Sequence, residues 1–358
     1  MIFKRETKFM FFKKKKTQPV YSYKNQFHFF PQATDFSPHL FESTHKTIHT
    51  VSKTGILSVE LLFKTLNKTL NYIGATSSRN IYIWGKDKTY ARQFGRFDKL
   101  FFFEHGWLPR SSYQMSPDGI NFSAHFAKWK YDPSKKTDPD INPVINNLRK
   151  LYFPPEKTES IIKEDYIIFP FQMSNDFNLK YAGEPFSSYF SRDKSQISKY
   201  LQFCIDYISD FNLDMPVVFK QHPMDTQDAS RLKLRRKQDR FILNSDNVSL
   251  GALLNKARGL VTVNSNSLHE ALVLNVPVKV LGNFLADISE YHNIFGNLLT
   301  PFIQNPLKNI KIHQYLRHVL SNQWYLSDFN NPLMVMELIT NSGYICPAKL
   351  RKKCRLIP

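Results

Sequence analysis

Polar residues that could do chemistry come directly after four apolar, β-prone runs of the chain. The clusters are Glu104 to Gly106, Gln172 to Asp176, Gln221 to Pro223, and Asn264 to Ser267 together with Glu270. Ligands of open α/β sheets bind outside the carboxyl ends of the strands. We therefore expect these clusters to face a substrate.

Two of the clusters contain carboxylates, Glu104 and Asp176, which fall in different halves of the chain. A carboxylate can act as a nucleophile or as a general acid or base. Paired carboxylates are also a common arrangement in enzymes that cleave glycosidic bonds. From spacing alone, either residue could equally be a helix N-cap or a surface acid, and Asp176 could simply cap a turn.

The fourth cluster, Asn264 to Ser267, has the composition of a phosphate site. A turn of Asn and Ser that opens a helix offers backbone N–H groups and hydroxyls to a phosphate. Ser267 and Glu270 also have the spacing of a capping box, in which both side chains bond backbone donors. The two interpretations are compatible, because Asn264 and Ser265 would remain free for a ligand.

His222 follows its strand directly and could meet a phosphate oxygen or assist a leaving group. Lys220, just before it, would add positive charge at the same place. The alternative is a solvated lysine at a strand end.

Short apolar runs alternate with helical patterns, which indicates an α/β fold with parallel sheets. Helices are expected at 56–70, 86–94, 195–211, 249–257 and 268–274, with Ser249 as an N-cap, and strands at 80–84, 99–104, 166–171, 216–220, 259–263 and 276–281. The region 130–160 is rich in Pro, Asp, Asn and Lys and is expected to join two domains. The expected division is a basic tail (1–45), an N-terminal α/β domain (46–160), a C-terminal α/β domain (161–300), and a helical segment with a basic tail (301–358).

The chain has 358 residues, of which 42% are hydrophobic, and a net charge of +19. Such a field attracts polyanions without choosing among them. The three cysteines form no CxxC pair, which argues against a disulfide framework or a structural zinc site and favours a reducing compartment. No run of about 18 apolar residues occurs, so no membrane-spanning helix is expected.

Three basic segments could contact an anionic membrane surface. They are the N-terminal MIFKRETKFMFFKKKK and the runs 231–240 and 349–355. The alternatives are a disordered arm for the first and solvated helix faces for the other two.

Several motifs occur in a characteristic order and resemble the capsule polysaccharide synthesis family. They are IYIWG (81–85), FFFEHGWLPRSSYQMSPDGIN (101–121), FPFQMSND (169–176), VVFKQHP (217–223) and VTVNSNSLHEALVLNVPVKVLG (261–282). The family includes bacterial β-Kdo transferases, which build a linker of Kdo (3-deoxy-D-manno-octulosonic acid) on capsule lipid anchors. The resemblance covers roughly residues 79 to 285.

The resemblance implies a GT-B-like fold, with two Rossmann-like domains facing a central cleft. The domain 46–160 would lie on the acceptor side, and the domain 161–300 would bind the nucleotide sugar. It also implies a CMP-Kdo donor, with neither a cofactor nor a metal. Asp176 would be the nucleophile of a retaining double displacement, Glu104 the acid/base, and His222 a contact to the donor phosphate or sugar. The implied substrate-binding residues are Gly106, Gln172, Lys220, Asn264, Ser265, Ser267 and Glu270, with the two serines on the CMP phosphate and Glu270 near the ribose or acting as a cap. The chain departs from the family where it has His105 and Asn175, positions that are often acidic.

The expected partners are a nucleotide sugar, a lipid-linked glycan acceptor, an anionic membrane surface and other capsule synthesis and export proteins, with no nucleic acid. The expected location is the inner face of the cytoplasmic membrane. Two alternatives stay open: a transferase with another CMP-activated donor such as CMP-sialic acid, or a non-catalytic polyanion-binding capsule assembly protein.

Overall fold

The structure is a computed structural model of the chain, and it divides into two compact units. Unit 1 comprises Met1–Phe126 and Leu320–Pro358, and unit 2 comprises Ala127–Val319. The structure describes residues 25–28, 56–75, 80–85, 98–108, 111–134, 141–152, 162, 164–191, 193, 195–211, 213, 215–225, 232–246, 248–285 and 307–355.

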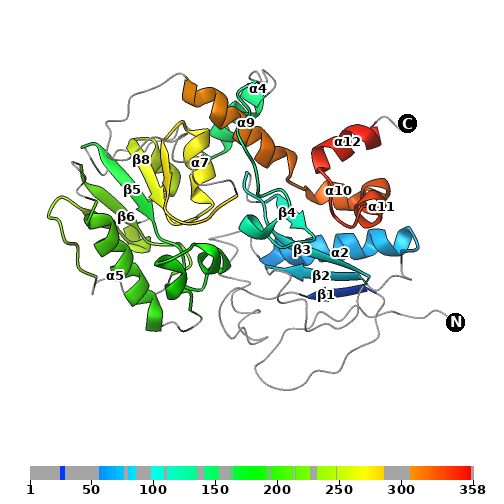
Figure 1. Cartoon of the computed structure of the whole chain (residues 1–358), viewed down its shortest axis with the longest axis horizontal. Coiled ribbons are helices and arrows are strands. Elements are labelled where there is room, and N and C mark those ends of the chain that lie inside the picture. The colour runs from blue at the N-terminus through cyan, green and yellow to red at the C-terminus, as the bar shows by residue number, and fades with distance from the viewer. Residues whose placement is uncertain are drawn as a thin grey trace. The chain divides into compact units, whose positions relative to one another are not determined.

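Unit 1 is built around a four-stranded sheet in the order β1-β2-β3-β4 (Figure 1). The strands are β1 (Asn25–His28), β2 (Asn80–Trp84), β3 (Lys99–His105) and β4 (Tyr113–Ser116). The first three strands are parallel, and β4 pairs with β3 in the antiparallel direction. This sheet carries Glu104 near the end of β3.

The C-terminal segment of the chain completes the core of unit 1. The helices are α2 (Ile56–Tyr72), α10 (Leu326–Asn330), α11 (Pro332–Thr340) and α12 (Pro347–Arg355). Apolar residues of α2, such as Phe63 and Leu66, share one hydrophobic cluster with Phe103 of β3 and with Trp324 and Leu338. These contacts bury aromatic side chains from both ends of the sequence, so unit 1 depends on both.

Unit 2 is built around a five-stranded sheet in which every neighbouring pair of strands is parallel. The strands are β5 (Tyr166–Pro170), β6 (Val217–Lys220), β7 (Arg240–Ile242), β8 (Ala257–Thr262) and β9 (Val278–Val280). Their order is β7-β6-β5-β8-β9. The chain therefore builds outwards from β5 in one direction and then resumes on its other side at β8. That reversal is a topological switch point, where open α/β sheets bind ligands.

Helices cover the sheet of unit 2. They are α4 (Ile141–Tyr152), α5 (Ser195–Ser209), α6 (Leu250–Leu254), α7 (Ser267–Val273) and α9 (Leu307–Ser321). Unit 2 also has short 3₁₀ turns at Phe177–Tyr181, Phe186–Tyr189 and Asn244–Asp246, and unit 1 has one at Asn121–Ser123. Phe169 and Phe219 point to the side of α5, with which they share a hydrophobic cluster. Tyr166 lies three residues before Phe169 on β5, so its side chain points to the opposite face of the sheet. There its hydroxyl donates to Leu253 O of α6 at 2.6 Å. The alternation of a strand thus places apolar side chains on both faces, as parallel sheets require.

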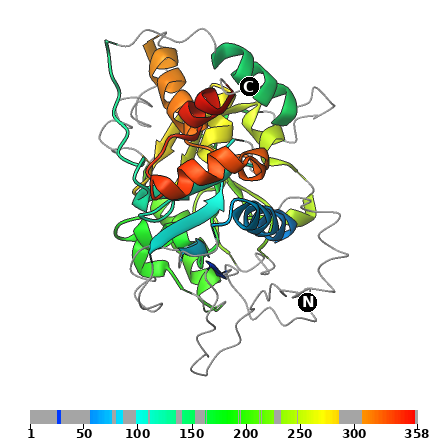
Figure 2. The ribbon, with the colours of Figure 1, turned by 90° about the vertical axis from the view of Figure 1, so that its right-hand side faces the viewer.

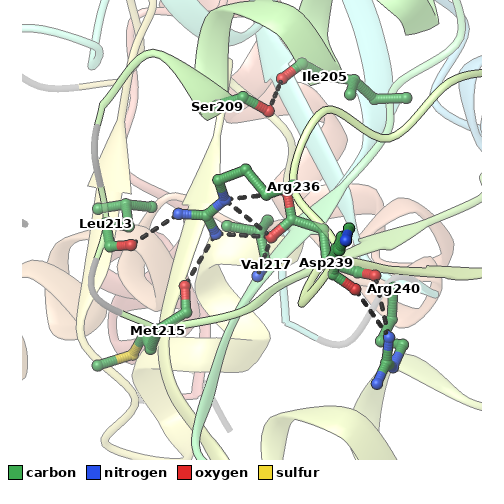
Figure 3. A network of polar contacts seen from close by, with 9 residues as sticks. Ile205, Ser209, Leu213, Met215, Val217, Arg236, Asp239 and Arg240 are labelled. Atoms are coloured by element: carbon green, nitrogen blue, oxygen red, sulfur yellow. Dashed lines mark hydrogen bonds and ion pairs between the residues drawn. The ribbon is translucent and has the colours of Figure 1, made fainter.

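Arg236 fixes the entry to β6 and changes the interpretation of the basic run 231–240. Its guanidinium donates to Leu213 O (2.6 Å), Met215 O (2.9 Å) and Asp239 Oδ1 (2.6 Å), as Figure 3 shows. Asp239 is buried and also accepts the Val217 N–H at 2.9 Å. The described part of this run is not helical, and Arg236 is a structural residue. The expectation of a solvated helix face is therefore wrong here.

The α/β class is confirmed, and all described strand pairs except β3–β4 are parallel. Most predicted elements lie within a few residues of their observed bounds. Ser249 is an N-cap as expected, since its side chain accepts the Ala252 N–H. The expected helix at 86–94 lies outside the described residues, whereas β1 forms inside the segment 1–45, which we expected to be a basic tail.

The region 130–160 differs from the expected linker because it contains α4. Ile145 and Leu148 of this helix are buried. The units also divide after Phe126 and again after Val319, whereas the sequence suggested boundaries at 160 and 300. The burial of α4 and the boundaries of the units depend on contacts between residues far apart in the sequence. Local composition therefore does not predict them.

Candidate functional site

Gln172 joins the ends of β5 and β8 at the switch point of unit 2. Its Oε1 accepts the Asn264 N–H at 2.9 Å, and its Nε2 donates to Asn264 Oδ1 at 2.9 Å. The same Nε2 lies 3.4 Å from Asp176 Oδ2. Both Gln172 and Asn264 are buried. One amide therefore couples the turn that carries Asp176 to the turn that carries the serines.

Asp176 is held at the start of a 3₁₀ turn. Its Oδ1 accepts the Asn178 N–H at 2.9 Å, which makes it the N-cap of Phe177–Tyr181. The capping role left open by the sequence is thus confirmed. The cap fixes one oxygen and orients the other towards Gln172, so capping and catalysis are compatible roles for this carboxylate.

Asn264 is committed to internal bonds. Its Nδ2 donates to Asn178 O (2.8 Å) and Asn283 O (3.1 Å), and its Oδ1 and N–H both bond Gln172. The expectation that Asn264 remains free for a ligand is wrong. Its four bonds tie the loops after β5, β8 and β9 together.

The turn from Ser265 to Ser267 is also partly closed on itself. Ser265 N donates to Thr262 Oγ1 (3.1 Å), and Ser267 N donates to Ser265 Oγ (3.3 Å). The expected capping box is absent, because Asn266 is the N-cap of α7 and makes no side-chain cap bond. Ser267 instead lies inside the helix, where its buried Oγ has no hydrogen-bond partner in the described part of the chain. Glu270 lies in the first turn of α7.

Two contacts from other helices hold α7. His269, fully buried, has its Nδ1 3.1 Å from Asn266 O and its Nε2 2.9 Å from Tyr315 Oη of α9. The two rings are stacked at 5.8 Å. At the other end of α7, Arg149 of α4 donates its Nε to Val273 O at 2.5 Å. The serine turn is therefore supported by a chain of contacts from α9.

Lys220 ends β6 and is almost fully buried, with 8% of its surface exposed. Burial lowers the pKa of its ammonium group, and the charge of Asp246 opposes that shift. Removing an ammonium group from water is unfavourable for folding. An anionic ligand at this edge of the sheet would offset that cost.

His222 is positioned by the turn that follows β6. Its Nδ1 accepts the Met224 N–H at 3.1 Å, so in the neutral ring Nε2 carries the proton. Asn244, after β7, bonds the backbone of this turn at His222 O (2.9 Å) and Asp225 O (3.0 Å). The arrangement presents Nε2–H as a hydrogen-bond donor.

In unit 1, Glu104 is buried at the end of β3, and its Oε1 accepts the His105 N–H at 2.9 Å. Gly106 is required by packing, because a Cβ there would lie 2.0 Å from Ser112 Oγ. Gln323 holds the following loop, since its Oε1 accepts the N–H groups of Trp107 (2.7 Å) and Leu108 (2.6 Å). The segment EHGWL thus has a rigid, internally bonded backbone.

The structure therefore brings together Gln172, Asp176 and Asn264 by direct bonds, with Ser265 on the adjoining turn. Lys220 and His222 lie at the end of β6, the strand next to β5. Glu104 and Gly106 belong to the other unit. The sequence analysis missed Asn244, Tyr315 and Gln323. No short motif marks them, because their function depends on partners distant in the sequence.

The described residues contain no group of three or more His, Cys, Asp or Glu side chains that could hold a metal ion. The metal-free reaction implied by the resemblance stays a prediction. None of the described helices has the length and apolar character that crossing a membrane requires.

Unit 2 therefore defines a doubly wound α/β fold with its polar cluster at the switch point. Residues 153–289, which contain that cluster, match the family described as "Capsule polysaccharide biosynthesis protein". The resemblance recognised in the motifs is thereby confirmed for this segment, and the motifs at 81–85 and 101–121 lie outside it. No curated protein matches the chain in sequence.

Three solved structures are similar to the chain. The "beta Kdo 2,7 transferase" KpsC of Thermosulfurimonas dismutans is 18% identical, with 89% of this chain and 98% of that chain covered and a TM-score of 0.44. The "beta Kdo 2,4 transferase" KpsC structure of the same organism is 14% identical, with 65% and 78% covered and a TM-score of 0.36. UDP-GlcNAc 2-epimerase of Methanocaldococcus jannaschii, in complex with UDP-GlcNAc and UDP, is 14% identical, with 72% and 80% covered and a TM-score of 0.28.

Proposed function

We propose that the chain is a glycosyltransferase of capsule polysaccharide synthesis that moves Kdo from CMP-Kdo to a lipid-linked or Kdo-primed acceptor, with retention of configuration. The proposed location is the inner face of the cytoplasmic membrane. The Gln172 junction is the observation that carries the proposal. It binds a carboxylate turn to a serine turn at the switch point, within the segment that matches the capsule family.

In the proposed reaction, the carboxylate of Asp176 attacks the anomeric carbon and CMP departs. Its N-cap bond and the contact with Gln172 hold the attacking group in one orientation, which lowers the entropy cost of attack. Glu104 is proposed to remove the proton of the acceptor hydroxyl, which then displaces Asp176 from the sugar.

CMP leaves as an anion, so the site must stabilise charge at the phosphate. Lys220, the Nε2–H of His222 and the hydroxyl of Ser265 are the proposed donors. The hydroxyl of Ser267, expected at the phosphate, is buried within α7 and is left out. The Ser265 hydroxyl serves this role better than the turn's amides, because the amides of both serines already have internal acceptors. Gln172 and Asn264 are proposed as positioning residues and Glu270 as a ribose contact.

The test is acceptor-dependent CMP release from CMP-Kdo by the wild type and by Asp176→Asn. Asparagine keeps the N-cap bond and removes the nucleophilic charge. We expect release to fall about a thousandfold or more. Asp206→Asn, on α5, is the matched control and should leave release unchanged.

If CMP were released only from another CMP-sugar, the proposed site would stand and the proposed donor would be wrong. Full activity of Asp176→Asn would exclude Asp176 as the nucleophile. If no nucleotide sugar reacted while polyanions still bound, the non-catalytic assembly role would replace the transferase.

A further inference from the structure

Helix α11 of unit 1 buries one apolar face and exposes two further apolar side chains. Met334, Val335 and Leu338 pack into the hydrophobic cluster, whereas Leu333 is 37% and Met336 50% exposed. Glu337 and Thr340, the two polar residues of PLMVMELIT, share the outer side with them at helical spacing. The outer side of α11 is therefore mixed, with two large apolar side chains exposed beside one acid and one threonine.

Helix α12 presents basic residues beside α11. Arg351 faces inwards, where it forms an ion pair with Asp328 at 2.9 Å and lies 4.6 Å from the centre of the Tyr325 ring. Helical geometry places Lys349, Lys352 and Lys353 on the side away from Arg351, and all three are exposed. The buried pairing of Arg351 thus fixes α12 with its lysines turned outwards.

The exposed sides of the two helices adjoin. Lys353 forms an ion pair with Glu337, which is the only acid between Pro332 and Arg355. Figure 2 shows α11 and α12 on the side of unit 1 that faces the viewer. We define the α11–α12 face as the exposed residues Leu333, Met336, Lys349, Lys352 and Lys353.

We propose that the α11–α12 face docks unit 1 onto an anionic lipid bilayer. Its apolar side chains suit the acyl boundary, and its lysines suit acidic headgroups. The nine residues of α11 are about 14 Å long, less than half of the roughly 30 Å hydrocarbon core. The helix therefore lies in the interface rather than across it. This proposal refines the location given above and requires nothing of the donor or of Asp176.

The first test is flotation of the full chain with phosphatidylcholine vesicles that contain roughly one third phosphatidylserine. The variant Lys349→Glu/Lys352→Glu should bind about thirty-fold less tightly, since each lysine at the surface contributes about 1 kcal/mol. The matched control is Lys233→Glu/Lys237→Glu, which changes two exposed lysines of unit 2 and gives the same net charge. Equal binding by both variants would overturn the proposal, because bulk charge alone would then explain the affinity.

The second test separates insertion from charge. Met336→Asp should weaken flotation about tenfold or more through lost apolar contact, whereas Val144→Asp, which alters an exposed valine of α4, should not. Light scattering without vesicles checks for a second copy: a dimer of the wild type that Met336→Asp dissolves would identify a protein interface and overturn lipid docking. CMP binding by each variant, measured by calorimetry, verifies the fold. Lost flotation with intact CMP binding supports the face, and flotation without any CMP binding would count against the proposed function alone.

Discussion

Replacing Gln172 with methionine would test whether one amide joins the two turns of the site. Methionine keeps the length of the side chain and removes both polar atoms. Asn264 would lose a bond to its N–H and a bond to its Oδ1, each 2.9 Å long in the native structure. Both groups are buried, and a buried polar group left unsatisfied costs about 1–3 kcal/mol. The expected loss in the free energy of unfolding is therefore about 2–5 kcal/mol.

Urea unfolding followed by circular dichroism measures this loss. Only the transition of unit 2 should shift, because Gln172 makes its bonds inside that unit. The matched control is Gln202→Met on α5, where the glutamine bonds Asp206 and the backbone of Lys233 at a partly exposed site. Water can replace those partners, so the control should change stability by less than about 0.5 kcal/mol.

The same variant tests the link to chemistry. Without the junction, the Asp176 turn and the serine turn are no longer coupled. The rate of CMP release should therefore fall by more than the loss of folded protein alone explains. A Gln172→Met protein that loses less than about 1 kcal/mol and releases CMP at the native rate would refute the junction as an organising element.

Three further predictions concern single side chains. Arg236→Met should destabilise unit 2 by about 3–5 kcal/mol in thermal or urea unfolding, because the buried Asp239 carboxylate would keep only the Val217 N–H. Lys220→Met should stabilise the protein and weaken CMP binding measured by calorimetry, since burial lowers the pKa of the native ammonium. Tyr315→Phe should raise KM for the nucleotide sugar several-fold with little change in kcat, because His269 would lose the 2.9 Å contact that supports the serine turn.

Each of these has a contrasting measurement. Arg235→Met removes an exposed ion pair with Asp210 and an exposed 3.4 Å contact with Asp206 O, and it should be nearly neutral. An equal loss in both arginine variants would contradict the buried-pair argument. The folded-state pKa of Lys220 lies below its unfolded value, so the advantage of Lys220→Met should be full at neutral pH and shrink as pH rises through that folded pKa. An advantage that does not depend on pH would refute this origin. A Tyr315→Phe variant that lost kcat alone would argue against a role in donor binding.

The strand ends of unit 2 could be predicted from the sequence because they follow local rules. Apolar runs such as 166–171 and 216–220 have the length of buried strands, and the switch-point rule places ligands at their carboxyl ends. The meeting of Gln172 with Asn264 follows from the order of β5 and β8 in the sheet. These parts required only short-range pattern and topology.

The wrong predictions share one cause: the residues concerned bond or pack with partners that are distant in the sequence. From the sequence, Asn264 is expected to be free for a ligand. In the structure, the loops after β5 and β9 supply acceptors for its side-chain amide. The spacing of Ser267 and Glu270 fits a capping box, yet α7 starts at Ser267 itself. Arg236 looks like one charge of a solvated run, but three acceptors from its own loop and from the entry to β6 surround it. Residues 141–152 were obscured by flanking prolines and aspartates, although Ile145 and Leu148 are one helical turn apart and buried.

The return of the chain to unit 1 after residue 319 has a consequence for biosynthesis. Unit 2 is one continuous stretch and emerges whole from the ribosome, whereas unit 1 must wait for Trp324, Phe329 and Leu338 to close its core. Domains generally fold as units in the order in which they are synthesised. Unit 1, whose segment up to Phe126 is made before unit 2, is therefore completed after it. Nascent unit 1 exposes the aromatic face of its sheet until residues 324–338 have been made, and a chain that stopped before them would leave unit 2 folded beside an unfinished partner that chaperones and proteases can recognise.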